Sequence, residues 1–127
     1  MSVTSDPGWT ERRADFRRLH EAGCFVIPNP WDVGSSRYLR HLGFRPLATT
    51  SAGFAWSRGR ADNGVALDEA LRHFEDVARS VDIPINGDFE GAFATEPAKV
   101  AANVRRAVAP GVSGVSIEDA TGADANP

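Results

Sequence analysis

Short apolar runs alternate along this chain with longer segments whose apolar residues recur at helical spacing. The clearest helical period runs through Leu67, Leu71, Phe74, Ala78 and Val81, at alternating steps of four and three residues. Such alternation favours right-handed βαβ units on a parallel sheet, and so the α/β fold class. The predicted strands are 24–27, 46–50, 83–88 and 112–118, and the predicted helices are 10–20, 31–43, 67–81 and 95–109.

Residues with capping chemistry lie near the ends of these helices. Thr10 and Thr95 are predicted as N-caps, and Pro97 suits the first turn of the last helix. A long glycine-bearing loop is expected from Ser51 to about Ala66. The three histidines fall inside predicted helices rather than at strand ends, so we expect surface or packing roles for His20, His41 and His73.

The length of the chain limits the architecture. The 127 residues, 42% of them hydrophobic, are expected to form one domain (1–127) with residues 1–8 flexible. A closed eight-stranded barrel takes about 250 residues, so four strands predict the first, N-terminal half of a (β/α)8 TIM-type barrel. An alternative is a complete four-stranded, doubly wound binding domain. That fold would need a G-x-G-x-x-G loop after the first strand, and residues 28–31 do not contain one.

Composition excludes several function classes. The net charge is -3, and the arginines are spread among acidic residues, so the sequence has no basic face for nucleic acid. No apolar run approaches the roughly 18 residues needed to span a membrane. The single cysteine, Cys24, cannot form an internal disulfide and is expected to be buried. We therefore expect a cytoplasmic protein that binds a small anionic ligand.

Acidic residues follow the third and fourth predicted strands. Alternation along a strand places Asp88, Glu90 and Glu118 toward the same side and turns Asp119 away. The carboxyl ends of parallel strands meet at one edge, where sites of α/β proteins lie. Gathered carboxylates repel unless a divalent cation offsets the repulsion, and oxygen ligands suit Mg²⁺. The alternative is that these acids only cap helices or lie in solvated loops.

The segment after the second predicted strand combines hydroxyl groups with successive backbone N–H groups. Residues 50–53 could therefore hold a carboxylate or enolate oxygen, although a Ser-Ala-Gly sequence also suits an ordinary turn. Asp62 lies further along the same loop, and its role is ambiguous when it is considered alone.

Taken together, these segments resemble the isocitrate lyase and phosphoenolpyruvate mutase superfamily. The resemblance extends from about residue 10 to 122 and depends on the order and spacing of its motifs. The matching pieces are Pro28-Asn29-Pro30-Trp31-Asp32 with Ser35-Ser36, Ala48-Thr49-Thr50-Ser51-Ala52-Gly53, Gly59 to Asp62, Gly87-Asp88-Phe89-Glu90-Gly91, and Val115-Ser116-Ile117-Glu118-Asp119.

The resemblance implies specific roles for these residues. Asp88 would bind Mg²⁺ directly, with Mn²⁺ as a substitute, while Glu90 and Glu118 would hold its water ligands. Glu90 departs from the family pattern, because many members have Asp there. The catalytic residues would be Asp62 and Ser51, and the substrate's oxygens would bind Thr50, Ser51, Ala52 and Gly53.

The resemblance also implies an activity. It is that of a Mg²⁺-dependent carbon–carbon lyase that cleaves a small 2-hydroxy carboxylate through an enolate and forms homo-oligomers at full length. The family's gating loop, with its catalytic lysine, would begin beyond Pro127. Phosphonopyruvate or phosphoenolpyruvate mutase or hydrolase chemistry therefore stays open, as does a truncated, non-catalytic half-barrel.

Overall fold

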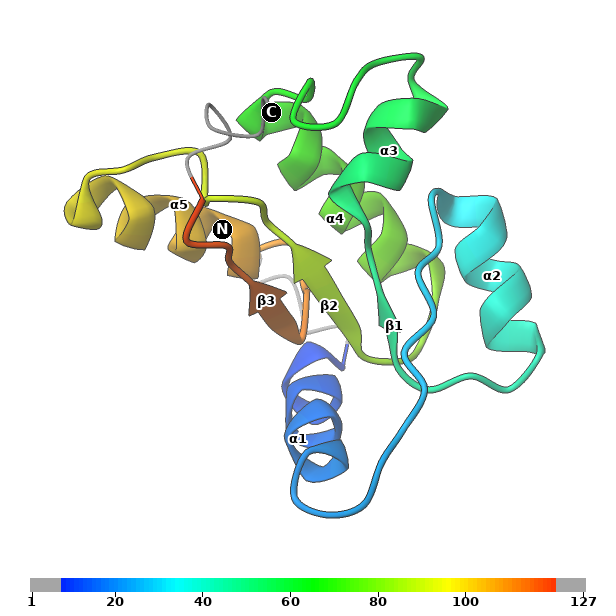
Figure 1. The fold of residues 1–127 in the computed structure, drawn as a ribbon. Helices are drawn as coiled ribbons and strands as arrows, with labels where there is room; N and C mark the ends of the chain where they lie inside the picture. Colours follow the sequence, from blue (N-terminus) through cyan, green and yellow to red (C-terminus); the bar gives the residue numbers. More distant parts are fainter. Residues whose placement is uncertain (1–7, 121–127) are drawn as a thin grey trace, which may run out of the picture.

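Helices and parallel strands alternate along the computed structural model, which describes residues 8–120 (Figure 1). The three strands form one parallel sheet in the order β1-β2-β3, with Leu47 paired to Ile85 and Asp88 paired to Ser116. The predicted parallel α/β fold is confirmed. The elements are α1 (Trp9–Leu19), α2 (Val33–His41), β1 (Leu47–Ala48), α3 (Ser51–Ser57), α4 (Leu67–Ser80), β2 (Ile85–Asp88), α5 (Pro97–Val108) and β3 (Gly114–Ser116).

The first predicted strand is wrong, because residues 24–27 are not part of the sheet. The chain passes beside β1, where Ala48 N–H donates to the Pro28 carbonyl at 3.1 Å. Pro28 and Pro30 have no N–H to donate, so this contact does not extend into a ladder. Cys24 is exposed, which corrects the expectation that it would be buried.

The loop predicted from Ser51 to Ala66 begins instead as the helix α3. Thr50 caps this helix, and its Oγ1 accepts a hydrogen bond from Gly53 N–H at 3.2 Å. Gly53 is buried, and a Cβ at this position would lie 2.4 Å from Cδ1 of Trp31. The glycine is therefore explained by close packing rather than by a turn.

Helix α4 packs its apolar face on the sheet. The buried residues of this face include Phe74, Val77 and Ala78, close to the prediction from helical period. A Cβ at Gly87 of β2 would lie 2.8 Å from the Phe74 ring, so this face of β2 contacts the helix. The main core consists of residues from these elements and their neighbours: Leu47, Phe74, Val77, Val81, Ile83, Ile85, Phe89, Ala92, Ala107 and Val112.

The opposite face of the sheet is polar at its centre. Asn86 Nδ2 donates to Ser116 Oγ at 2.7 Å across β2 and β3. A Cβ at Gly114 would lie 2.4 Å from the ring of Phe16, so α1 reaches this face close to where β3 begins. The predicted alternation of apolar and polar faces is thus confirmed within the strands.

Helix α1 lies below the strands in Figure 1 and leaves their carboxyl ends uncovered. Its N-cap is Gly8 rather than Thr10, and the N-cap of α5 is Glu96 rather than Thr95, although Pro97 does occupy the first turn. Residues 1–7, which belong to the segment predicted to be flexible, lie outside the described residues. Between residues 8 and 120, no helix combines the length and the hydropathy needed to cross a membrane.

Candidate functional site

The segments that follow the three strands meet at the carboxyl edge of the sheet. Asp88 N–H donates to Thr49 Oγ1 at 2.9 Å, which joins the end of β2 to the end of β1. On the other side, Glu118 N–H donates to the Glu90 carbonyl at 2.9 Å. The sheet pairing therefore continues past the strand ends and holds the predicted acids in neighbouring segments.

The carboxylate of Asp88 is fixed by Ser51 through one of its oxygens. Both the backbone N–H and the hydroxyl of Ser51 donate to Asp88 Oδ2, at 2.8 and 2.9 Å. Within the described part of the chain, Oδ1 accepts no hydrogen bond. The sequence predicted a role for each residue but not this contact, which leaves one carboxylate oxygen available to a ligand.

Glu90 is a carboxyl whose charge is disfavoured by its surroundings. It is only 9% exposed. Burial and, to a smaller extent, the negative charges of Asp62, Asp88 and Glu118 together raise its pKa from 4.5 to about 7. Three of the acids singled out from the sequence therefore act on the fourth, Glu90, at this edge.

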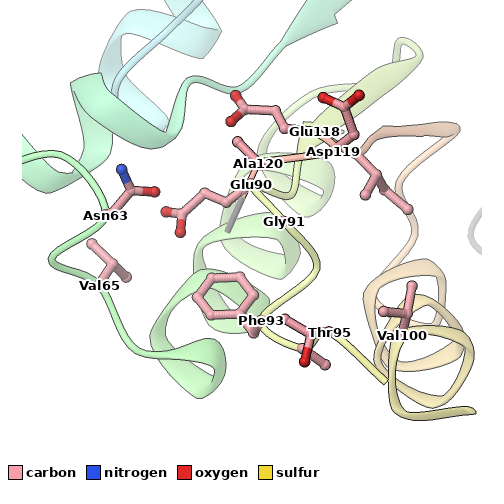
Figure 2. Close-up of a pocket in the computed structure, with 12 residues that line it drawn as sticks. Asn63, Val65, Glu90, Gly91, Phe93, Thr95, Val100, Glu118, Asp119 and Ala120 are labelled. Atoms are coloured by element: carbon pink, nitrogen blue, oxygen red, sulfur yellow. The ribbon is translucent and has the colours of Figure 1, made fainter. Parts of the chain in front are cut away.

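A cleft of about 640 Å³ opens beside Glu90 (Figure 2). In Figure 2 the Glu90 carboxylate points toward Asn63, while Glu118 and Asp119 lie at another part of the rim. Asp119 also lines the cleft, but it is not among the acids that raise the pKa of Glu90. That it turns away from the metal site stays a prediction. The rest of the wall is largely apolar, with Val65, Phe93, Val100 and Ile117.

The predicted substrate-binding segment forms the first turn of α3. Ser51 N–H is used by Asp88 and Gly53 N–H by Thr50, which leaves the Ala52 N–H without a partner among the described residues. Asp62 is exposed and accepts a hydrogen bond from Asn63 N–H at 2.9 Å. The catalytic and binding roles of these residues stay predictions.

The donor chemistry of this edge suits a hard divalent cation. The candidate ligands are all carboxylate oxygens, and the pKa of Glu90 is raised first by burial and then by the neighbouring negative charges, whose repulsion a cation would relieve. Among residues 8–120, no three His, Cys, Asp or Glu side chains form a group able to hold one metal ion. This arrangement fits Mg²⁺, which keeps several water ligands and binds proteins through one or two carboxylates.

His73 has a packing role, in agreement with the sequence. Its ring stacks on Phe54 with centroids 3.9 Å apart, and its buried Nε2 has no hydrogen-bond partner within residues 8–120. Asn63 and Phe93 line the cleft, but the sequence analysis did not select them, because they come from irregular segments without a periodic signal. Thr49 belongs to a matching motif but was given no role.

Comparison with known proteins supplies the family. The family model described as phosphoenolpyruvate phosphomutase matches residues 16–127. An uncharacterized protein of Mycobacterium tuberculosis is 31% identical over 107 residues, which are 84% of this chain and 40% of that protein. The chain thus spans about two fifths of the length of this curated relative.

Solved structures of similar fold include enzymes. A Burkholderia cenocepacia protein provisionally assigned as a lyase/mutase is 44% identical, with a TM-score of 0.88 over 91% of this chain and 42% of that chain. A 2,3-dimethylmalate lyase of the PEP mutase/isocitrate lyase superfamily is 26% identical, with a TM-score of 0.76 over 90% and 40%. A phosphonopyruvate hydrolase, solved with oxalate and Mg²⁺, shares the fold at 20% identity, with a TM-score of 0.81 over 87% and 39%.

Proposed function

The chain belongs to the phosphoenolpyruvate phosphomutase family, and on this premise we propose that it serves Mg²⁺-dependent cleavage of a carbon–carbon bond in a small 2-hydroxy carboxylate. The observation that supports this most directly is the Asp88 carboxylate. One of its oxygens is fixed by Ser51, and the other is left without a partner among the described residues, next to the buried Glu90.

In this proposal Asp88 binds Mg²⁺ directly, and Glu90 and Glu118 bind the water ligands of the ion. Mn²⁺ would occupy the same donors. The bound cation would supply positive charge to the oxygen on which negative charge develops. Ser51 orients Asp88 through two hydrogen bonds, so it acts on the site even without touching the substrate.

Cleavage would convert the 2-hydroxy carbon into a 2-oxo carbon. The hydroxyl proton passes to a general base, the electron pair of the broken carbon–carbon bond passes to the second acid as an enolate, and the enolate carbon then takes up a proton. The Ala52 N–H, which has no partner among the described residues, and the hydroxyl of Thr50 lie at the first turn of α3 as candidate donors to substrate oxygens. Asp62 contributes the further acid of the site.

The alternative is phosphorus–carbon chemistry, which the name of the matching family and the phosphonopyruvate hydrolase neighbour keep open. The described cleft favours the lyase. Its wall is largely apolar and so suits the hydrocarbon part of a substrate rather than an anionic group such as a phosphonate. We therefore place the hydrocarbon part of a carboxylic acid there.

An assay panel tests the proposal. The full-length gene product is incubated with Mg²⁺ and methylisocitrate, dimethylmalate, oxaloacetate or phosphonopyruvate, with Asp88→Asn as the matched control. We expect turnover of a 2-hydroxy acid that requires both Mg²⁺ and Asp88. Turnover of phosphonopyruvate alone would favour the alternative, and inactivity on all four would contradict both.

The alternative of a non-catalytic half-barrel predicts a chain that does not respond to Mg²⁺. The proposed function instead includes a homo-oligomer. Size-exclusion chromatography during a Mg²⁺ titration separates these ideas. We expect an oligomer that responds to Mg²⁺. A stable monomer without a metal response would contradict the proposed site in this chain.

A further inference from the structure

The loop that contains Glu90 has a strained backbone. Glu90, Ala92 and Phe93 have φ angles of 49°, 57° and 56°, so three non-glycine residues within four positions are left-handed. This conformation is costly for residues with a Cβ, and it persists only where the surrounding structure imposes it. Something outside the loop must therefore hold it.

Two backbone hydrogen bonds fix the ends of this loop. Ala92 N–H donates to the Phe89 carbonyl at 2.8 Å, and Glu118 N–H donates to the Glu90 carbonyl at 2.9 Å. Phe89 and Ala92 are also completely buried. These contacts anchor the loop to the core and to the segment after β3.

A side chain from α5 provides a third attachment. Asn103 Nδ2 donates to the Ala92 carbonyl at 2.9 Å. Among the described residues, this is the only side chain that hydrogen-bonds to the backbone of residues 90–93. Asn103 lies next to Val100 and Val104 on the half-buried face of the helix, where a polar group is costly unless it is hydrogen-bonded.

We propose that Asn103 is a positioning residue that holds the 90–93 loop in its left-handed conformation and so fixes the Glu90 carboxylate in the metal site. The link to metal binding rests on the proposed function. The role of Asn103 in holding the loop does not rest on the proposed function, because it concerns only the hydrogen bond from α5 to the strained loop.

Replacement of Asn103 by Leu tests this role. Leucine has the same branched arrangement of side-chain heavy atoms as asparagine and favours the helix, but it removes the donor to the Ala92 carbonyl. In the whole chain we expect amide hydrogen exchange at Ala92 and Glu118 to accelerate about five- to tenfold. The Phe89 amide, which donates to the Ser116 carbonyl, reports on the sheet and should be unchanged.

Metal affinity provides the second readout. A Mn²⁺ titration of Asn103→Leu should show weaker binding by a similar factor, because Glu90 is no longer held. Lys99→Ala, an exposed position on the same helix, should leave both readouts unchanged. Ala92→Gly in the Asn103→Leu chain should restore part of the loss, because glycine adopts a positive φ at low cost.

The outcomes separate the inference from the proposed function. A wild-type chain that does not bind Mn²⁺ would contradict the proposed function, while the exchange rates would still test Asn103. Exchange rates in Asn103→Leu equal to those of the wild type would overturn the inference. So would an equal effect of Lys99→Ala, which would show a response of the whole helix.

Discussion

Glu90 is a single residue whose place in the proposed binding site lowers the stability of the metal-free fold. Its carboxyl is buried beside three other acids, and its pKa is raised to about 7. The fold tolerates this arrangement because the loop is anchored by hydrogen bonds and by the core. A site prepared for a cation is therefore expected to destabilise the metal-free protein.

Glu90→Gln tests this opposition. At pH 8 and without metal, we expect the variant to unfold with a free energy roughly 2–3 kcal/mol higher, because an ionised carboxylate is removed from an unfavourable place. Its affinity for Mg²⁺ should fall. Urea unfolding and a Mg²⁺ titration measure the two effects, with the exposed Glu96→Gln as control. A variant that is less stable than the wild type would contradict the repulsion.

His73 predicts a pH dependence of stability. Burial lowers its pKa from the usual 6.5 to about 4. Between these values the unfolded chain binds a proton that the native chain does not, so stability falls as the pH decreases from 6.5 to 4.

We expect His73→Phe to keep the stacking on Phe54 and to remove about 2–3 kcal/mol of this acid-dependent loss. Urea unfolding at pH 4.5 and pH 7 measures it, with the exposed His41→Gln as control. An unchanged pH dependence in His73→Phe would show that other groups cause the loss.

At the scale of elements, the close approach of α3 to Trp31 explains why residues 51–57 are helical despite their glycine. Trp31 and Trp56 also contact each other, with ring centroids 5.7 Å apart. Local sequence favoured a loop here, and packing of the helix against neighbouring side chains favoured the helix. The sequence interpretation treats Gly53 as a loop glycine, whereas the structure explains it by close packing within a helix.

Gly53→Ala is expected to lower the free energy of unfolding by about 1–3 kcal/mol, because its Cβ would lie 2.4 Å from Trp31. Gly34→Ala in α2 is the matched control. Its Cβ would lie 3.5 Å from Asp32 Oδ1, an ordinary van der Waals distance, so we expect a neutral or slightly stabilising effect. Thermal unfolding of both variants measures the difference. Equal effects would show that α3 moves freely away from Trp31.

At the scale of the whole molecule, the sheet of three strands has two edges, and unpaired edges favour association. Ile117 follows β3, also lines the cleft and is 46% exposed. Its exposed part provides an apolar surface near this edge that supports association between chains.

Ile117→Lys should therefore weaken self-association at least about fivefold, because a lysine at a sheet edge opposes pairing. Sedimentation velocity over a concentration series measures the dissociation constant. Leu42→Lys, at the exposed C-cap of α2, is the control. A larger effect of Leu42→Lys would place the contact on the helices instead.

The sequence predicted those features that depend on neighbouring residues. Helical period identified α4, strand alternation assigned the faces of β2 and β3, and the acids after those strands were found at one edge. The prediction was wrong where contacts distant in sequence decide the outcome. Residues 24–27 are apolar, yet the prolines that follow prevent a ladder beside β1.

By itself, the sequence determined the parallel α/β order, the family and the set of acids, because period and motif spacing are local properties of the chain. Only the tertiary structure decided that Ser51 fixes Asp88, that Asp119 lines the cleft and that Asn103 holds the Glu90 loop. Each of these depends on a hydrogen bond or a packing contact between elements. The energy of such contacts exists only after the chain has folded.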